Sequence, residues 1–256
     1  NKAFVGLGYS ISPKFSIGAD FSYNFGKIET SSLLFVTNSD GSIIQYGSRE
    51  KNRSDIRGAT FTTGLSYQSK INSKLSLFSS LTFSPESKLT SYNNRKLATI
   101  QYIASGAEVV VDEEEIPVES NTIKLPAKFS FGAGFGQLKK WMIGTEITYQ
   151  ESSKMGNRFN DINNVNFENA IKYNIGGYFI PNYNSFSNYW NKVAYRGGLR
   201  YENTGLIFNN KSINDVALTL GLGLPVPGAF SNINIGFEYG QRGTTTANLV
   251  QENYAN

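Results

Sequence analysis

The strongest constraint on the fold is an alternation of apolar and polar residues with a period of two. Residues 141–150 read WMIGTEITYQ, and every apolar side chain except Met142 falls on the same set of alternate positions. Side chains of a strand point alternately to its two faces, so this pattern predicts a strand with one apolar and one polar face. It recurs along the chain, and no segment shows the 3.6-residue apolar stripe of an amphipathic helix. We therefore predict an all-β chain.

Eleven segments carry the alternation. They span residues 2–11, 15–29, 58–70, 75–90, 127–136, 140–152, 167–181, 192–208, 215–224 and 231–241, with an incomplete one starting at 249. Short turns alternate with long polar loops near 30–57, 91–126 and 153–166. Short turns at one end and long loops at the other are typical of bacterial outer-membrane barrels. We predict a single domain over residues 1–256, a transmembrane antiparallel up-and-down β-barrel.

The composition of the two faces favours lipid over a second sheet as the environment of the apolar face. The polar face is rich in Gly, Ser, Thr and Asn, and charged residues make up 17% of the chain. Trp141 and Tyr149 are eight residues apart on the apolar face, or roughly 26 Å along a strand, close to the height of a membrane-facing apolar band. Aromatic residues at the membrane interfaces are predicted to be Trp141, Tyr149, Tyr173, Tyr195, Tyr201 and Tyr239. A soluble β-sandwich or jelly roll is the less favoured alternative.

The residue inventory excludes several classes of function. The chain has no Cys and no His, so it lacks a thiol nucleophile, an imidazole base and a zinc finger. Glu146 and Glu168 have no partner at a spacing that indicates acid/base catalysis, and we expect neither an enzyme nor a cofactor. The net charge is +4, but the basic residues are scattered along the sequence, usually beside acids. Nucleic-acid binding, which needs a contiguous basic stripe, is therefore not expected.

The phase of the strands predicts that the natural barrel is longer than this sequence. If the short turns lie in the periplasm, the first and last segments both run toward it. Closed bacterial barrels have even strand numbers and no free edge. We therefore expect strands before Asn1 and the end of a strand after Asn256, with the barrel in the outer membrane of a Gram-negative bacterium.

Several short runs, most of them in the last third of the chain, resemble a known family. They are KFSIG (14–18), PAKFS (126–130), YRGGLRY (195–201), TGL (204–206), IND (213–215), GLGLP (221–225), NIGFEYGQRGT (234–244) and ENY (252–254). In these runs the chain is similar to the FadL-like outer-membrane transport proteins of the Bacteroidota type. The resemblance implies a 14-stranded barrel that passes hydrophobic small molecules, here as a fragment without the amino-terminal hatch and first strands.

Strand parity places a set of charged residues inside the barrel. They are Asp20, Glu146, Glu168, Lys172, Arg196, Arg200, Glu202 and Glu238. Charges in a narrow lumen usually pair with one another, so bracing is favoured over the binding of a carboxylate or polar solute. Inward apolar residues, the candidates for a hydrophobic ligand site, are sparse: Phe4, Phe78, Met142, Tyr178 and Ile180.

Two loop features remain. The acidic run Asp112, Glu113, Glu114 and Glu115 lacks the spacing of an EF-hand loop, so a solvated outer loop, or one that meets lipopolysaccharide through divalent ions, is favoured over a calcium site. Residues 182–190 read NYNSFSNYW. This polar and aromatic connection is expected to anchor at the membrane interface, with a contact to a partner as the alternative.

Three functions are compatible with this sequence. The first is diffusion of a hydrophobic molecule, such as a long-chain fatty acid or an aromatic hydrocarbon, through a plugged lumen. The second is a structural or docking subunit of a larger outer-membrane machine for secretion or barrel insertion, which the sparse apolar lumen favours. The third is a general polar porin, although no charged constriction is evident. The expected partners are the lipid bilayer and lipopolysaccharide, with a hydrophobic ligand or other outer-membrane proteins according to the function.

Overall fold

The computed structural model describes residues 1–37, 43–103, 105–155, 165–226 and 231–256. These residues form strands and three short 3-10 helices. The strands are β1 (Lys2–Ser10), β2 (Phe15–Thr37), β3 (Ile43–Lys70), β4 (Ser76–Ser84), β5 (Ser87–Tyr102), β6 (Glu108–Ile116), β7 (Asn121–Leu125), β8 (Lys128–Gln137), β9 (Trp141–Gln150), β10 (Val165–Phe167), β11 (Ala170–Phe179), β12 (Ala194–Phe208), β13 (Lys211–Pro225), β14 (Asn232–Gly243) and β15 (Gln251–Ala255). The 3-10 helices are η1 (Ser152–Lys154), η2 (Tyr189–Lys192) and η3 (Thr246–Asn248). None of the described helices is long and apolar enough to cross a membrane.

The strands form one 15-stranded sheet, and the predicted all-β antiparallel class is confirmed. The main path runs β1-β2-β3-β4-β8-β9-β11-β12-β13-β14-β15, and its eleven strands correspond to the eleven predicted segments. The additional strands β5, β6, β7 and β10 branch from this path. No pairing joins β1 to β15 among the described residues, so the closed barrel and its fourteen strands stay predictions.

Contacts divide the chain into two compact units. Unit 1 comprises residues 1–4, 22–60 and 87–124, and unit 2 comprises residues 5–21, 61–86 and 125–256. The long strand β3 contributes to both, since its residues 47–57 pair with β5 in unit 1 and its residues 63–70 pair with β4 in unit 2. The single domain over residues 1–256 stays a prediction.

Unit 1 contains strands at positions where the sequence pattern predicts loops. Residues 30–37 and 43–57 belong to β2 and β3, and much of 91–126 forms β5, β6 and β7. Polar side chains support these strands by pairing across them: Arg95 Nε donates to Asn52 Oδ1 at 2.9 Å, and Lys96 Nζ to Glu113 Oε1 at 2.8 Å. Because both faces carry polar residues, the period-two signal is absent although the backbone is extended. In the third expected loop, 153–166, residues 156–164 lie outside the described residues.

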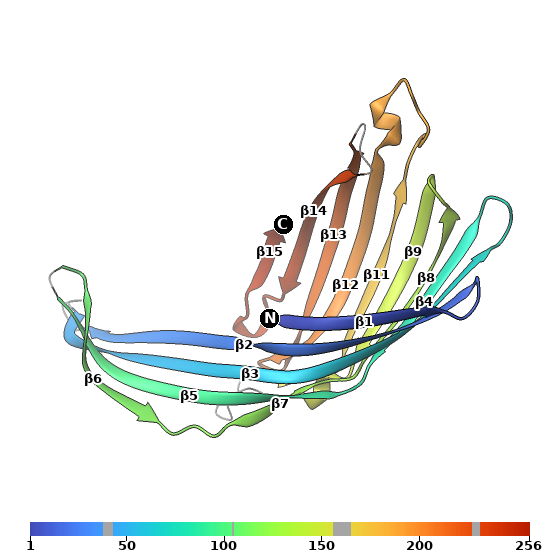
Figure 1. The fold of residues 1–256 in the computed structure, drawn as a ribbon. Coiled ribbons are helices and arrows are strands. Elements are labelled where there is room, and N and C mark those ends of the chain that lie inside the picture. Colours follow the sequence, from blue (N-terminus) through green and yellow to red (C-terminus); the bar gives the residue numbers. More distant parts are fainter. Residues whose placement is uncertain (38–42, 104, 156–164, 227–230) are drawn as a thin grey trace. The chain divides into compact units, whose positions relative to one another are not determined.

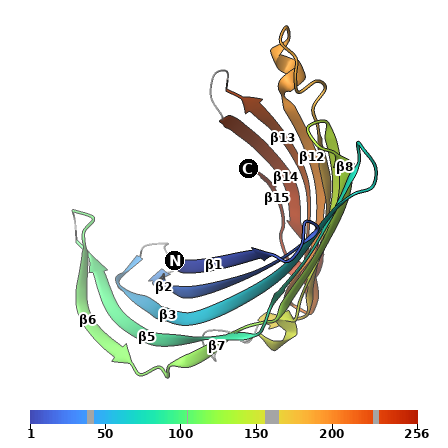
Figure 2. The ribbon, with the colours of Figure 1, turned by 45° about the vertical axis from the view of Figure 1, so that its right-hand side comes forward.

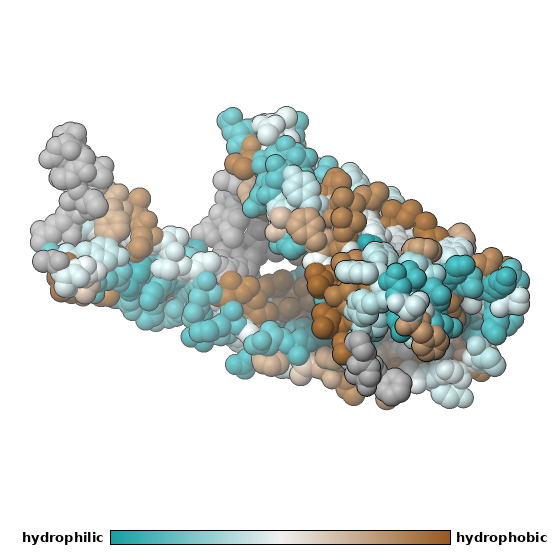
Figure 3. Space-filling view, turned by 90° about the horizontal axis from the view of Figure 1, so that it is seen from above, coloured by the Kyte–Doolittle hydropathy of each residue, from teal (hydrophilic) through white to brown (hydrophobic). Residues whose placement is uncertain are grey.

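In unit 2 the antiparallel strands β8, β9, β11, β12, β13 and β14 lie side by side (Figures 1 and 2). Their apolar residues occupy one face and are solvent-accessible in the chain, with Phe131 51% and Leu199 56% exposed. Hydrophobic residues are accordingly visible at the surface in Figure 3. No second layer of the described chain covers this face, which is the condition expected of a lipid-facing sheet and not of a sandwich.

The predicted interface aromatics all lie on this apolar face. Trp141 aligns through Phe179 with Tyr195, next to the short turns. Tyr149 is the partner of Phe129 at the other end of β9, and Tyr173 pairs with Tyr201 two residues nearer the middle. Tyr239 aligns with Leu218, between these rows. Their depth in a bilayer stays a prediction.

Candidate functional site

The polar face of unit 2 has a central row of four glycines, which present no side chain. Gly134, Gly144, Gly176 and Gly198 are successive cross-strand partners. A Cβ atom added to Gly134 would lie 2.9 Å from the carbonyl oxygen of Ile143, closer than real Cβ contacts. The strands therefore lie too close together to leave room for a side chain in this row. The residues on either side of the row border open space.

Two hollows lie on this face. The first, about 580 Å³, brings together Phe78, Met142 and Tyr178, three of the predicted apolar residues, with Glu146 and Arg196. The second, about 620 Å³, lies toward the short turns and is lined by the buried Ile180 together with Tyr178 and Arg196. The remaining apolar candidate, Phe4, belongs to unit 1 and lines neither hollow.

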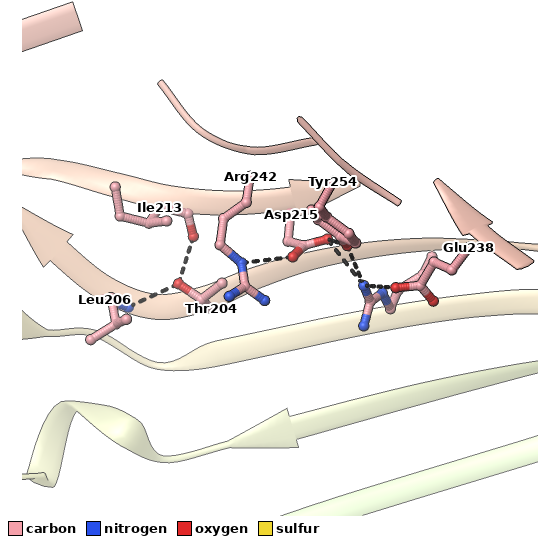
Figure 4. Close-up of polar contacts among 8 residues, drawn as sticks. Thr204, Leu206, Ile213, Asp215, Glu238, Arg242 and Tyr254 are labelled. Carbon is pink, nitrogen blue, oxygen red and sulfur yellow. Dashed lines mark hydrogen bonds and ion pairs between the residues drawn. The ribbon is translucent and has the colours of Figure 1, made fainter. Parts of the chain in front are cut away.

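Polar side chains of four neighbouring strands meet at Asp215 (Figure 4). Asp215 is fully buried. Arg200 of β12 donates through Nη2 to Asp215 Oδ1 at 3.2 Å and to Glu238 Oε1 at 3.0 Å. Arg242 Nε donates to Asp215 Oδ2 at 2.8 Å. The hydroxyl of Tyr254, on β15, donates to Asp215 Oδ1 at 2.8 Å and lies 2.7 Å from Arg200 Nη2. Two cations and two carboxylates balance, so the cluster needs no charged ligand.

The structure also locates the other predicted lumen charges. Glu146 accepts a hydrogen bond from Asn174 at 3.2 Å, and Glu168 accepts one from Asn203 at 3.0 Å. Lys172 and Glu202 are cross-strand partners. Arg196 Nη1 donates to Asn234 Oδ1 at 2.8 Å, and Asp20 lies on β2 near Gly6. Of the eight predicted residues, Arg200 and Glu238 are joined to each other by a described ion pair.

Three members of the cluster were not predicted: Asp215, Arg242 and Tyr254. Asp215 and Arg242 share the polar face with Glu202, because the three are successive cross-strand partners. Strand parity extended by a few residues at each end would have found the first two. Tyr254 follows from the pairing of β14 with β15, which the incomplete last segment did not define.

The acidic run lies on β6, not in a loop. Successive residues of a strand point to opposite faces, so Asp112 and Glu114 face away from Glu113 and Glu115. Glu113 pairs with Lys96 and Arg49, and Glu115 accepts a hydrogen bond from Asn94. Among the described residues no group of acids is arranged to hold a metal ion.

A family model described as BamG matches residues 1–256. No curated protein matches the sequence at a significant level. Among solved structures, the CymD monoaromatic hydrocarbon channel is similar with a TM-score of 0.53 at 14% identity, over 93% of this chain and 67% of that chain. The structure of the RagAB peptide transporter has a TM-score of 0.47 at 14% identity, over 98% of this chain and 33% of that chain.

The match corrects the family read from the sequence. The assignment to the FadL-like transport family is wrong, because the model that matches all 256 residues is BamG. The error has a structural reason: this chain is similar in fold to a hydrocarbon channel, and the alternating pattern that was read from its sequence reports the fold. At 14% identity that likeness concerns the fold alone. The findings support the predicted class of outer-membrane β protein.

Proposed function

The chain belongs to the BamG family, and we propose from this membership that it is a structural subunit of the BAM complex, which inserts β-barrels into the outer membrane of Gram-negative bacteria. The family match over residues 1–256 is the observation that carries the proposal. It corresponds to the second function considered from the sequence, a docking barrel within a larger machine.

The polar face supports this role. A subunit that serves as a scaffold needs a rigid sheet, and the cluster around the buried Asp215 joins β12, β13, β14 and β15 through side chains in addition to the backbone ladder. Its charges are balanced internally, so it does not offer an unpaired cation or carboxylate to a solute. The exposed apolar face supplies the contact with lipid or with another membrane protein.

The test is purification of the tagged full-length protein from its own outer membrane in mild detergent, followed by native mass spectrometry. We expect a stoichiometric assembly that contains the other BAM proteins. An outer-membrane barrel of similar abundance, tagged in the same way, is the control for incidental co-purification. Isolation of the chain as a lone barrel, with no more BAM protein than the control, contradicts the proposal.

A second function, binding of a hydrophobic small molecule, has one observation in its favour. Phe78, Met142 and Tyr178 gather in a single hollow of about 580 Å³, a volume suited to a small ligand. Glu146 and Arg196 line the same hollow, which makes it less apolar than a typical hydrocarbon site. Acyl or aromatic adducts in the mass spectrum would favour this function, and a steady open conductance in a planar bilayer would favour a polar porin.

A further inference from the structure

Charge in unit 2 is separated along the strands. The runs 5–19, 61–85, 125–145, 169–201 and 216–237 contain ten Lys and Arg residues and no Asp or Glu. These runs hold the short turns with the strands that flank them. Every carboxylate of unit 2 therefore lies outside them, beginning at Asp20, Glu86, Glu146, Glu202 and Glu238.

The antiparallel topology gathers the basic residues of these turns at one end of unit 2, which we call the basic end. It comprises Lys14, Lys70, Lys74, Lys139, Lys140, Lys192 and Arg196. Six of the seven side chains are exposed, and Lys192 is half-buried. The turns of the basic end lie at the same ends of their strands in Figure 1. None of the seven forms an ion pair with a carboxylate among the described residues.

Part of the basic end is a pocket. It is the hollow of about 620 Å³, and its charged lining residues are Lys139, Lys192 and Arg196. Tyr178, Tyr183 and Ile180 supply its aromatic and aliphatic walls. Lys139 Nζ lies 4.8 Å from the centroid of the Tyr183 ring, a cation–π contact between two residues that line the pocket. Three cations thus converge on a partly apolar hollow with no carboxylate among its described lining.

Cations that converge without a counter-charge favour an anionic ligand. The aromatic wall adds apolar contact, which a small inorganic anion would not use. Arg196 and Tyr178 are cross-strand partners on the polar face, and their chain neighbours Tyr195 and Phe179 lie on the apolar face. A phospholipid headgroup lies on the lipid-facing side, whereas a water-exposed polypeptide has access to the polar side. These observations favour carboxylate side chains carried by a polypeptide.

We propose that the basic end binds an acidic polypeptide segment, whose carboxylates pair with Lys139, Lys192 and Arg196 in the pocket and whose apolar side chains contact Tyr183 and Ile180. That the segment comes from another protein of a complex rests on the proposed function. The binding itself does not, because the pocket belongs to this chain alone.

The test uses the purified full-length protein in nanodiscs of neutral phosphatidylcholine. The probe is a short fluorescein-labelled peptide of alternating glutamate and tyrosine, and the control peptide has glutamine in place of glutamate. Fluorescence anisotropy should show binding of the glutamate peptide that weakens as salt is raised. The variant carrying Lys139→Glu and Lys192→Glu should bind about tenfold more weakly, since two favourable charge contacts become repulsive.

The matched control is Lys211→Glu, the same change of charge at an exposed lysine. Lys211 begins β13, at the end of that strand away from the basic end. It should bind like the unchanged protein. If the double variant does not fold, Arg196→Gln, which removes one cation from the pocket without reversing charge, replaces it. Equal binding by the pocket variant and the Lys211 variant overturns the proposal, as does equal binding of the glutamine peptide.

A third arm separates lipid from polypeptide. If the protein associates with phosphatidylglycerol vesicles through the basic end but does not bind the peptide, the proposal is overturned in favour of a lipid contact. Because these assays contain no other protein, their failure leaves the co-purification test of the proposed function intact. Failure of co-purification likewise leaves peptide binding measurable.

Discussion

Replacing Asp215 by asparagine should destabilise the last strands of the sheet. The carboxylate is 0% exposed and accepts hydrogen bonds from Arg200 and Tyr254 on Oδ1 and from Arg242 on Oδ2. Asparagine keeps the shape of the side chain, but one of its two polar atoms becomes a donor. Whichever way the amide is turned, an N–H group faces another donor, and the buried negative charge is lost.

The size of the effect follows from the hydrogen bonds to the carboxylate and from the buried ion pairs that it forms. A hydrogen bond to a charged group contributes about 1.5–3 kcal/mol, and removal of one partner from a buried ion pair costs about 3–5 kcal/mol. Arg242 is 55% exposed and can be solvated when its acceptor is lost, so the low end applies. We expect a loss of about 3 kcal/mol in the free energy of unfolding, which for a chain of this length lowers the melting temperature by about 6–12 °C.

The assay is thermal unfolding of the full-length protein in detergent, followed by circular dichroism of the β signal. Glu202→Gln is the matched control, because Glu202 is the cross-strand partner of Asp215 on the same face and makes no ion pair among the described residues. The control should shift the melting temperature by about 2 °C or less. If Asp215→Asn shifts it no more than Glu202→Gln does, the buried cluster does not brace the sheet.

Two further predictions concern other parts of the chain. A Cβ at Gly177 would collide with the carbonyl oxygen of Met142, whereas one at its cross-strand partner Gly197 would lie 3.9 Å from the nearest atom. Gly177→Ala should therefore cost about 1–3 kcal/mol in the same unfolding assay and Gly197→Ala almost nothing, and equal losses would contradict the close approach. In unit 1, the hydrogen bond from Lys96 lowers the pKa of Glu113 below its ordinary value of 4.5, so its contribution to stability is present above pH 4.5 and is lost as the pH falls through the lowered pKa. The protection factors of the β5 and β6 amides, which are corrected for the intrinsic pH dependence of exchange, should fall over that acidic range. Glu113→Gln should remove this acid-dependent part, and an unchanged titration in the variant would refute the pairing.

The period-two rule predicted the strands that have one apolar face and missed those that have none. All eleven strands of the main path were found, because each presents alternating apolar and polar residues. In β5 and β6 the extended backbone depends instead on pairs such as Arg95 with Asn52 and Lys96 with Glu113, whose partners are distant in sequence. Local patterning does not contain that information, so these strands were expected to be loops.

Errors in strand boundaries explain what was missed at the site. Arg200 and Glu238 lie well inside predicted segments, and parity placed them on the polar face. Asp215 was the first residue of a predicted segment, although β13 begins at Lys211, and Arg242 lies one residue beyond a segment that continues to Gly243 in β14. Residues at the ends of segments were not assigned to a face. For that reason Asp215, the centre of the cluster, was not predicted.

The basic end shows a different limit. Neighbouring turns contribute lysines that are far apart along the chain, as Lys14 is from Lys70 and Lys74 is from Lys139, and no window of the sequence is strongly basic. Only the order of the strands brings them together, since every second connection of an antiparallel path returns to the same end. The scattered basic residues that argued against nucleic-acid binding thus become a single charged surface after folding.

The two charged regions of unit 2 are consistent with one division of roles. Around Asp215, each described cation has a carboxylate within hydrogen-bond distance. That pairing stabilises the folded chain and is not available to another molecule. At the basic end, Lys139, Lys192 and Arg196 have no such partner among the described residues, so their charge remains available to another molecule. A carrier would be expected to keep its unpaired polar groups along the path of its ligand. A chain that pairs the charges around Asp215 and leaves the cations of its turns without a carboxylate partner among the described residues is suited to act by association, which is the role proposed for it.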